Sequence, residues 1–259
     1  MNITGTTLIF PIIGHPVSGV FSPPAFNIEF KKRGLDIAMV PLDISPPVLK
    51  VFWELLRTSE NLVGCSVTYP HKQAAYAAMN ELTPRAQRLG AVNTVRKQGS
   101  RLIGDATDGL AMCAAIEKMN MKIAGSSAFV LGAGGGAGVA IVDELCAKGL
   151  RRLTVSDNNE VRRNAVLDLV ARYWPDVEVS QDKGACDILI NATTLGKTPL
   201  DECPFTEQSI KMASVVGDVV THVTATRLIG VSQALGVRSI SGEQMGQGQI
   251  ATQLSFLGY

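Results

Sequence analysis

The sequence lacks the features that mark secreted, membrane-spanning and zinc-binding proteins. Its five cysteines are an odd number without C-x-x-C spacing, which favours reduced thiols over a disulfide framework or a zinc site. No apolar run reaches the roughly 20 residues that a membrane span requires. No basic stretch precedes the first apolar segment. We therefore expect no signal peptide, no membrane association and a cytoplasmic location.

Charged and aromatic residues are also few. Charged residues make up 18% of the chain, aromatic residues 5%, and the formal net charge is +1. There is no run of Lys and Arg, so we expect no nucleic-acid partner. The histidines His15, His71 and His222 have no metal-ligand spacing, and we expect no metal site. The 259 residues, 46% of them apolar, suffice for two ordinary domains with their own cores.

Glycine, in contrast, is dense in the stretch Gly132–Ala137, which lies between a predicted strand and a predicted helix. Ala128–Leu131 is a short apolar run typical of a buried parallel strand, and Val139–Cys146 continues with helical spacing. Between them lies a G-x-G-x-x-[G/A] pattern, in the strand–turn–helix context of a dinucleotide-binding loop. Glycines allow the tight turn and the approach of a pyrophosphate, and a small third residue lets the helix pack close to the strand. The alternative is a glycine-rich turn that binds nothing. The candidate cofactor-binding residues of this loop are Gly132, Ala133, Gly134, Gly135, Gly136 and Ala137, with Ala137 as the small third residue.

A carboxylate follows at the distance that the same motif predicts. Leu153–Ser156 is predicted to be the next strand and ends at Asp157, some 20 residues beyond the loop. A carboxylate there accepts hydrogen bonds from a ribose 2′-OH and repels a 2′-phosphate. Asp157 and Asn158 are therefore candidate cofactor residues, and we expect NAD in preference to NADP. The basic pair Arg162 and Arg163 is the open alternative: it is a solvated helix face, or it reaches a 2′-phosphate.

Strands and helices alternate along the chain, which predicts parallel sheets and an α/β fold. We expect two lobes with a cleft between them, and a helical tail that returns to the first lobe. The domain boundaries place residues 1–107 and 238–259 in one domain and residues 108–237 in the other. The first strands are expected at Leu8–Ile13 and Ala38–Leu42.

Two residues at the ends of predicted strands suit the oxidation of an alcohol. Lys72 lies just past a strand end, and Asp108 lies at a helix start. An Asp–Lys pair would orient the lysine to take the hydroxyl proton as hydride leaves. From spacing alone, a solvated lysine and an ordinary helix N-cap are the more frequent interpretation.

Several motifs, in order along nearly the whole chain, resemble the shikimate dehydrogenase family. The motifs with their family patterns are Gly64–Lys72 (G-x-N-V-T-x-P-x-K), Gly90–Thr94 (G-A-x-N-T), Gly104–Gly109 (G-x-N-T-D-G), Gly132–Ala137 (the glycine loop), Asn191–Gly196 (N-A-T-x-x-G) and Gly242–Gln249 (G-x-x-M-x-x-x-Q). The loop from Gly14 to Pro23 is similar to the family's substrate loop. So many ordered motifs are specific for the family, though not for one substrate.

The resemblance implies a fold and a set of roles. It implies an N-terminal α/β substrate domain and a doubly wound, Rossmann-like NAD(P)-binding domain. Lys72 and Asp108 would be the catalytic pair, with Lys72 handling the proton of the alcohol. Substrate contacts would come from Ser22, Ser66, Thr68, Asn93, Thr221 and Gln249, and further cofactor contacts from Thr193, Val219 and Gly242.

Some positions depart from the family pattern. Val20 stands where the first serine of a carboxylate clamp is usual, and Thr221 stands where a tyrosine is usual. Ser66 and Ala106 each stand where an asparagine is usual. Because a hydrogen bond to a charged group contributes about 1.5–3 kcal/mol, we expect weakened binding of shikimate itself and a divergent member of the family.

The sequence therefore predicts an NAD(P)-dependent oxidoreductase. It would interconvert shikimate, or a close cyclic hydroxy acid such as quinate or aminoshikimate, and its 3-dehydro ketone. We expect a small-molecule substrate as partner and a monomer or homodimer. The alternative is a dinucleotide-binding regulatory paralogue without turnover. The substitutions favour that alternative, and the retention of Lys72, Asp108 and Gln249 argues against it.

Overall fold

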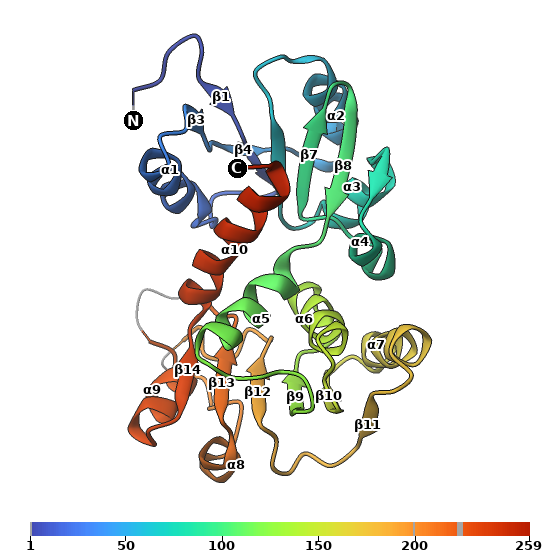
Figure 1. Ribbon diagram of the computed structural model, residues 1–259, viewed down its shortest axis with the longest axis vertical. Coiled ribbons are helices and arrows are strands. Elements are labelled where there is room, and N and C mark those ends of the chain that lie inside the picture. Colours follow the sequence, from blue (N-terminus) through green and yellow to red (C-terminus); the bar gives the residue numbers. More distant parts are fainter. Residues whose placement is uncertain (1, 199, 222–224) are drawn as a thin grey trace. The chain divides into compact units, whose positions relative to one another are not determined.

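The computed structural model describes residues 2–198, 200–221 and 225–259. His222, one of the three histidines considered above as metal ligands, lies outside these residues. The chain divides into two compact units. The first contains the described residues up to Thr107 together with Ile250–Tyr259, and the second contains Asp108–Gln249. Figure 1 shows the elements of both along the chain.

The first unit is built on a mixed sheet with strand order β4-β2-β5-β7-β8-β6. Neighbouring strands are parallel except at β5–β7 and β7–β8, which pair antiparallel. A separate parallel pair joins β1 to β3. The strands are β1 (Leu8–Ile9), β2 (Ile12–Gly14), β3 (Ile37–Ala38), β4 (Pro41–Asp43), β5 (Gly64–Val67), β6 (Glu81–Leu82), β7 (Thr94–Gln98) and β8 (Arg101–Asp105).

Helices cover both faces of this sheet. One core joins the sheet to α2 and α3, through residues such as Phe52, Cys65 and Ala75. The other joins β2 to α1 and to the end of α10, through residues such as Phe26 and Leu254. The helices are α1 (Ser22–Lys32), a 3₁₀ turn at Pro46–Val48, α2 (Leu49–Thr58), α3 (Lys72–Ala78), α4 (Pro84–Leu89) and the last turns of α10 (Gly242–Leu257).

The second unit is a parallel sheet with strand order β11-β10-β9-β12-β13-β14. This order, with the first strand of the unit in the middle, is that of a doubly wound dinucleotide-binding fold. The strands are β9 (Ser127–Leu131), β10 (Arg152–Ser156), β11 (Glu178–Ser180), β12 (Ile188–Asn191), β13 (Val215–Asp218) and β14 (Arg238–Ile240).

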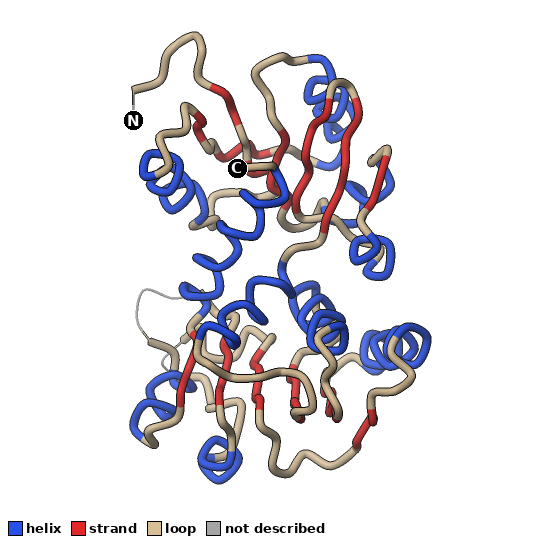
Figure 2. Tube along the Cα trace, in the orientation of Figure 1, coloured by secondary structure: helices blue, strands red, loops and turns tan. Residues whose placement is uncertain are grey.

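Alternate residues of these buried strands pack into two different cores. Val130 and Ile190 face a core shared with α5, α6 and α7. Phe129 and Leu189 face the opposite core, shared with α8 and α9. Helices therefore lie on both faces of the sheet, as Figure 2 shows for this unit. The helices are α5 (Asp108–Lys118), α6 (Gly136–Ala147), α7 (Glu160–Tyr173), α8 (Glu207–Met212), α9 (Arg227–Ala234) and the first turns of α10.

The α/β fold class is confirmed, and three local expectations are corrected. The runs Leu8–Ile13 and Ala38–Leu42 each divide between the two-stranded pair and the larger sheet, as β1 with β2 and as β3 with β4. The first unit is mixed rather than parallel, because β7 and β8 form a hairpin. The chain returns to the first unit at Ile250 and not at residue 238, because β14 pairs with β13. Among the described residues, no helix is long and apolar enough to cross a membrane.

Candidate active site

In the first unit, the predicted substrate residues of β5 lie where this strand ends. Ser66 is buried in β5, and the N–H of Thr68 continues the ladder by donating to Ile13 O at 2.9 Å. The close approach of Gly14 fixes Thr68, because a Cβ on Gly14 would lie 2.5 Å from Thr68 Cγ2. Lys72 is the first residue of α3, and its backbone oxygen accepts from Val92 N at 2.9 Å.

Asn93 is held by a buried hydroxyl network just before β7. Its Oδ1 accepts from the backbone N–H of Thr107 at 2.8 Å and from the Thr107 hydroxyl at 3.1 Å. The Thr94 hydroxyl donates to the same oxygen at 3.0 Å. These donors fix the orientation of the amide. Thr107 is absent from the predicted site residues, although it stands in the Gly104–Gly109 motif.

The predicted carboxylate contact Ser22 opens α1. It is half-buried, and Phe26 and Phe30 anchor the same helix in the core. Val20, which replaces the first serine of the family clamp, packs against this apolar cluster together with Ile250 and Leu254. The half-buried Val20 therefore adds an apolar contact to this cluster where a serine would present a hydroxyl group.

In the second unit, the glycine loop follows β9 as predicted. Gly132 has φ 78°, and a Cβ there would lie 2.7 Å from Thr193 Cγ2, so the loop after β9 touches the loop after β12. Gly135 is the N-cap of α6, with no side chain to occupy the first helical N–H groups. Gly136 has open space where a Cβ would stand. An uncapped helix start under an open glycine loop fits a pyrophosphate.

The close packing between helix and loop occurs at Gly138, one residue later than expected. A Cβ on Gly138 would lie 2.2 Å from Gly132 O and 2.8 Å from Ala133 Cα. The prediction did not include Gly138, and the role of Ala137 stays a prediction. The sequence signal for Gly138 is that it is a further glycine directly after Ala137. The G-x-G-x-x-[G/A] pattern accepts alanine at its last position, so it already ends at Ala137.

Asp157 braces the glycine loop. Its Oδ2 accepts from Gly134 N at 3.0 Å, and its Oδ1 accepts from Asn159 N at 2.9 Å and from Arg162 Nη2 at 3.3 Å. The Asp157 side chain is only 4% exposed, whereas that of Arg162 is 54% exposed. Exposed Asn158 also contacts Arg162, with Oδ1 3.4 Å from Nη2. At this corner the exposed charge is the guanidinium, and the carboxylate is turned inward.

Thr193 is fixed by the side chain of Asn191, the last residue of β12. Asn191 Oδ1 accepts from the Thr193 hydroxyl at 2.6 Å, and Asn191 Nδ2 donates to Asp218 Oδ1 at 3.0 Å. Asp218 also accepts from the Thr226 hydroxyl at 2.6 Å. Burial raises the pKa of Asp218 above its ordinary value, against the lowering effect of these hydrogen bonds. The ends of β12 and β13 are thus joined by one polar network.

Three further predicted residues follow β13 or open α10. Val219 is half-buried against the core of the unit, and Thr221 is exposed. Gly242 begins α10, and a Cβ there would lie 2.4 Å from Val220 O. Only glycine therefore allows α10 to start this close to the end of β13.

Asp108 and Gln249 meet in the second unit. Gln249 Nε2 donates to Asp108 Oδ1, so the start of α5 is tied to α10. Asp108 is buried at the first turn of its helix. Lys72 belongs to the first unit and Asp108 to the second. Among the described residues, no group of three His, Cys, Asp or Glu side chains is arranged to hold a metal ion.

Comparison with known proteins identifies the family. The model of the shikimate dehydrogenase substrate binding domain matches residues 12–95. A shikimate dehydrogenase (NADP(+)) of Rubrobacter xylanophilus is 33% identical over 252 residues, which cover 94% of this chain and 88% of that protein. The chain belongs to the shikimate dehydrogenase family. The resemblance of the motifs is therefore confirmed, and the chain is an oxidoreductase of this family.

Solved structures related to this shikimate dehydrogenase family member include two with a TM-score near 0.9. A 5-ketofructose reductase of a Gluconobacter strain has a TM-score of 0.90 and 26% identity, over 98% of this chain and 94% of that one. A shikimate 5-dehydrogenase of Listeria monocytogenes, in complex with shikimate and NAD, has a TM-score of 0.88 and 26% identity, over 100% and 94% of the two chains. Binding of a nicotinamide dinucleotide follows from the family and from the loop geometry.

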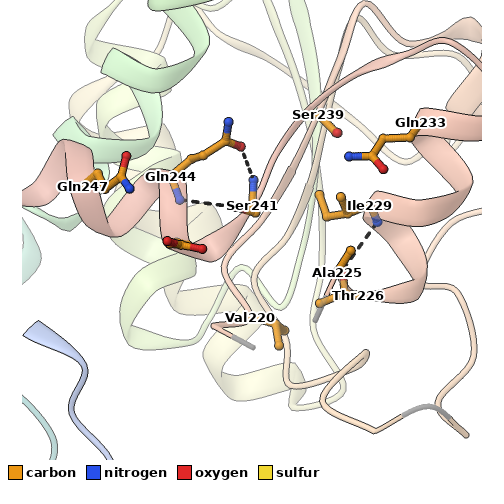
Figure 3. A pocket seen from close by; sticks show the side chains of 10 residues that line it. Val220, Ala225, Thr226, Ile229, Gln233, Ser239, Ser241, Gln244 and Gln247 are labelled. Carbon is orange, nitrogen blue, oxygen red and sulfur yellow. Dashed lines mark hydrogen bonds between the residues drawn. The ribbon is translucent and has the colours of Figure 1, made fainter. Parts of the chain in front are cut away.

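The second unit of this shikimate dehydrogenase family member also contains a pocket of about 400 Å³ near the start of α10. It adjoins the predicted cofactor residues Val219 and Gly242 without including them. Figure 3 shows Ser241 and Gln244 at its wall, where Ser241 N donates to Gln244 Oε1 at 2.9 Å. Its lining combines apolar and polar, mostly uncharged side chains: Val220, Ala225, Thr226, Ile229, Gln233, Ser239, Ser241, Glu243, Gln244 and Gln247.

Proposed function

We propose that this protein interconverts shikimate, or a close cyclic hydroxy acid, and the corresponding ketone with a nicotinamide dinucleotide. The observation that carries the proposal is the buried Asp108, tied to Gln249 in a chain whose Lys72 stands in the family's lysine motif. The names of the curated relatives support the substrate.

In this proposal Lys72 takes the proton of the substrate hydroxyl, and Asp108 orients the same hydroxyl. The cofactor, when bound, accepts the hydride from the carbon that bears this hydroxyl. The hydroxyl oxygen keeps the electron pair of its broken O–H bond, so a C=O double bond forms. The amide of Gln249 holds the Asp108 carboxylate, and the amide of Asn93, fixed by Thr94 and Thr107, binds a second hydroxyl.

Two observations support NADP as the preferred cofactor, against the expectation of NAD from the sequence. The curated relatives are named as NADP(+) enzymes. At the corner where a 2′-phosphate would bind, Arg162 is exposed and the Asp157 carboxylate is engaged by the loop. A guanidinium binds phosphate with charge-assisted hydrogen bonds. The alternative that the sequence left open for Arg162 is therefore the one we adopt.

A second candidate substrate is an uncharged polyhydroxy ketone. Val20 packs in an apolar cluster where the family has a serine that binds carboxylate. The related Gluconobacter structure is that of a 5-ketofructose reductase. The loss of one clamp hydroxyl removes a hydrogen-bond donor to a carboxylate. It therefore weakens the binding of a charged acid more than the binding of a neutral polyhydroxy ketone.

The test is a screen for cofactor reduction or oxidation by the purified protein. Shikimate, quinate and aminoshikimate are offered with NADP and with NAD, and 5-ketofructose is offered with the reduced cofactors. We expect turnover of a cyclic acid by the wild type and a loss of at least 1000-fold in kcat for Lys72→Met. Cofactor affinity should be retained in that variant. Full turnover by Lys72→Met would remove the lysine from the mechanism, and no turnover of any compound by the wild type would favour the regulatory paralogue.

A further inference from the structure

The last turns of α10 run along β5 in a matched register. Leu257 Cδ2 lies 3.2 Å from the position that a Cβ would take at Gly64. One turn earlier in the helix, Gln253 Nε2 donates to Ser66 Oγ at 3.3 Å. A helical turn of four residues rises about 6 Å, and two strand residues rise about 6.6 Å. Each turn of α10 therefore faces the next same-side residue of β5.

This row of side chains continues into the candidate substrate site. Because alternate residues of a strand share a face, the residue after Gly64 and Ser66 in the row is Thr68. The ladder with β2 is intact up to that point: Ser66 N donates to Pro11 O at 2.8 Å and Thr68 N to Ile13 O at 2.9 Å. Gln253 therefore contacts Ser66, a predicted substrate residue, and the next same-side position is Thr68, another predicted substrate residue.

Gln253 is an unfavourable residue for stability alone. The side chain is 2% exposed, and within the described part of the chain its Oε1 is buried without a hydrogen-bond partner. An apolar residue of the same length would avoid the desolvation of this acceptor. Violations of polar satisfaction are expected where function requires the residue.

The family pattern explains why an amide is needed here. The family motif has an asparagine at position 66. This chain has a serine there, which carries a hydroxyl group in place of the carboxamide. In the same side-chain rotamer, an asparagine would extend about 1.3 Å beyond the position of Ser66 Oγ. Gln253 Nε2 lies only 3.3 Å from that oxygen, so the larger amide would crowd the glutamine side chain. An amide at position 66 and a glutamine at position 253 therefore compete for one space.

We propose that Gln253 is a positioning residue for substrate recognition: it holds the Ser66 hydroxyl and supplies from α10 the amide that position 66 lacks. The inference rests on the proposed function, because Ser66 is one of the substrate contacts that the resemblance to the family implies for a cyclic hydroxy acid. Ser66 on β5 presents a hydroxyl group and Gln253 on α10 presents an amide, where the family pattern has a single asparagine at position 66. It sets how tightly a cyclic hydroxy acid binds, and not how fast hydride moves.

The experiment measures dissociation constants for shikimate and quinate by calorimetry, together with kcat, KM and Tm. Gln253→Met keeps the length of the side chain and removes its hydrogen bond. We expect the dissociation constant and the KM of the better-bound acid to rise five- to twentyfold. We expect kcat and the KM of the cofactor to stay within twofold and Tm not to fall. Ser255→Ala, on the exposed side of the same helix, is the matched control.

A second set of variants tests the competition for space. Ser66→Asn alone should weaken acid binding more than tenfold, and Ser66→Asn with Gln253→Ala should recover most of that loss. The inference is overturned if Gln253→Met leaves acid binding within twofold or lowers only Tm. It is also overturned if the double variant is no better than Ser66→Asn, or if the wild type binds neither acid. Turnover decides the proposed function separately, because acid binding without turnover would refute the enzyme while leaving the role of Gln253 in place.

Discussion

The Asp157 carboxylate accepts a hydrogen bond of 3.0 Å from the backbone N–H of Gly134, so the residue that ends β10 braces the loop that follows β9. If bracing is its main role, Asp157→Ala should weaken NADP and NAD alike, each by about tenfold, because the loop loses an acceptor. The measurement is the dissociation constant of each cofactor by fluorescence titration. A rise in the preference for NADP would instead show that Asp157 discriminates at the ribose.

Arg162 provides the complementary experiment at the same corner. Its exposed guanidinium lies 3.3 Å from Asp157 Oδ1 and is placed to bind a 2′-phosphate. We expect Arg162→Ala to lower kcat/KM with NADP about tenfold, equal to 1.4 kcal/mol, and to leave NAD within about threefold of the wild type. Arg163→Ala is the neighbouring control. Equal losses with the two cofactors would contradict a role at the 2′-phosphate.

Gly138 and Gly136 form a matched pair in α6. A Cβ on Gly138 would meet backbone atoms of the glycine loop, the nearest at 2.2 Å, so Gly138→Ala must shift the loop. We expect a loss of about 1–3 kcal/mol in the free energy of unfolding and weaker cofactor binding. Gly136→Ala meets open space and should change stability by less than about 1 kcal/mol. Denaturant unfolding of both variants checks this, and equal effects would show that the loop tolerates the shift.

Thr107 tests how Asn93 is oriented. Thr107→Val removes one of the hydroxyl donors to Asn93 Oδ1, at 3.1 Å, and keeps the shape of the side chain. We expect the free energy of unfolding to fall by about 0.5–1.5 kcal/mol and the KM of the acid to rise several-fold, while kcat changes less. Steady-state kinetics with both cofactors measure the split. An unchanged KM would mean that Thr94 and the backbone of Thr107 orient the amide on their own.

Asp187 gives a prediction for pH dependence. Burial acts to raise its pKa, but hydrogen bonds from the Ser127 hydroxyl at 2.7 Å and from the Ser127 N–H at 2.8 Å, together with the charges of Arg151 and Arg152, outweigh burial. The pKa of Asp187 is therefore lowered from its ordinary value of 3.8. A lowered carboxyl pKa contributes stability that is full above 3.8 and is lost as the pH falls through the folded-state pKa.

We therefore expect Ser127→Ala to destabilise the protein at pH 7, with a deficit that shrinks as the pH falls below 3.8. Urea unfolding at a series of pH values, with the exposed-loop variant Ser100→Ala as control, measures the deficit. A deficit of the same size at all pH values would mean that the Ser127 hydroxyl acts through packing and not through the charge of Asp187.

The second unit was more predictable from sequence than the first, for a physical reason. Its central strands β9, β12 and β13 are buried almost throughout, so they stand out in the sequence as continuous apolar runs such as Ala128–Leu131. In the first unit, the run Leu8–Ile13 divides between two sheets. Nothing in an apolar pattern marks where a strand changes its partner, because both halves of the run consist of apolar residues.

Residues of the candidate site could be predicted from the sequence where they belong to a motif. Residues that are recognised only by their tertiary contacts could not be predicted. Lys72, Asn93 and Gln249 stand in recognisable motifs. Gln253 contacts Ser66 and Thr107 contacts Asn93, 187 and 14 residues away in the sequence, and no local spacing shows such partners. The orientation of the Asp157 side chain could not be predicted either. The sequence around an aspartate at a strand end is the same whether its carboxylate faces a ribose or a loop.

The division of α10 has a consequence for the order in which the protein folds during synthesis. The second unit is one continuous segment, Asp108–Gln249, whereas the first needs Ile250 and Leu254 to complete its core beside Phe10 and Phe26. Domains generally fold as units while the chain emerges from the ribosome. The part that is translated first therefore keeps an open apolar face until the last turns of α10 have been synthesised, whereas the other unit has all its residues once Gln249 has been added.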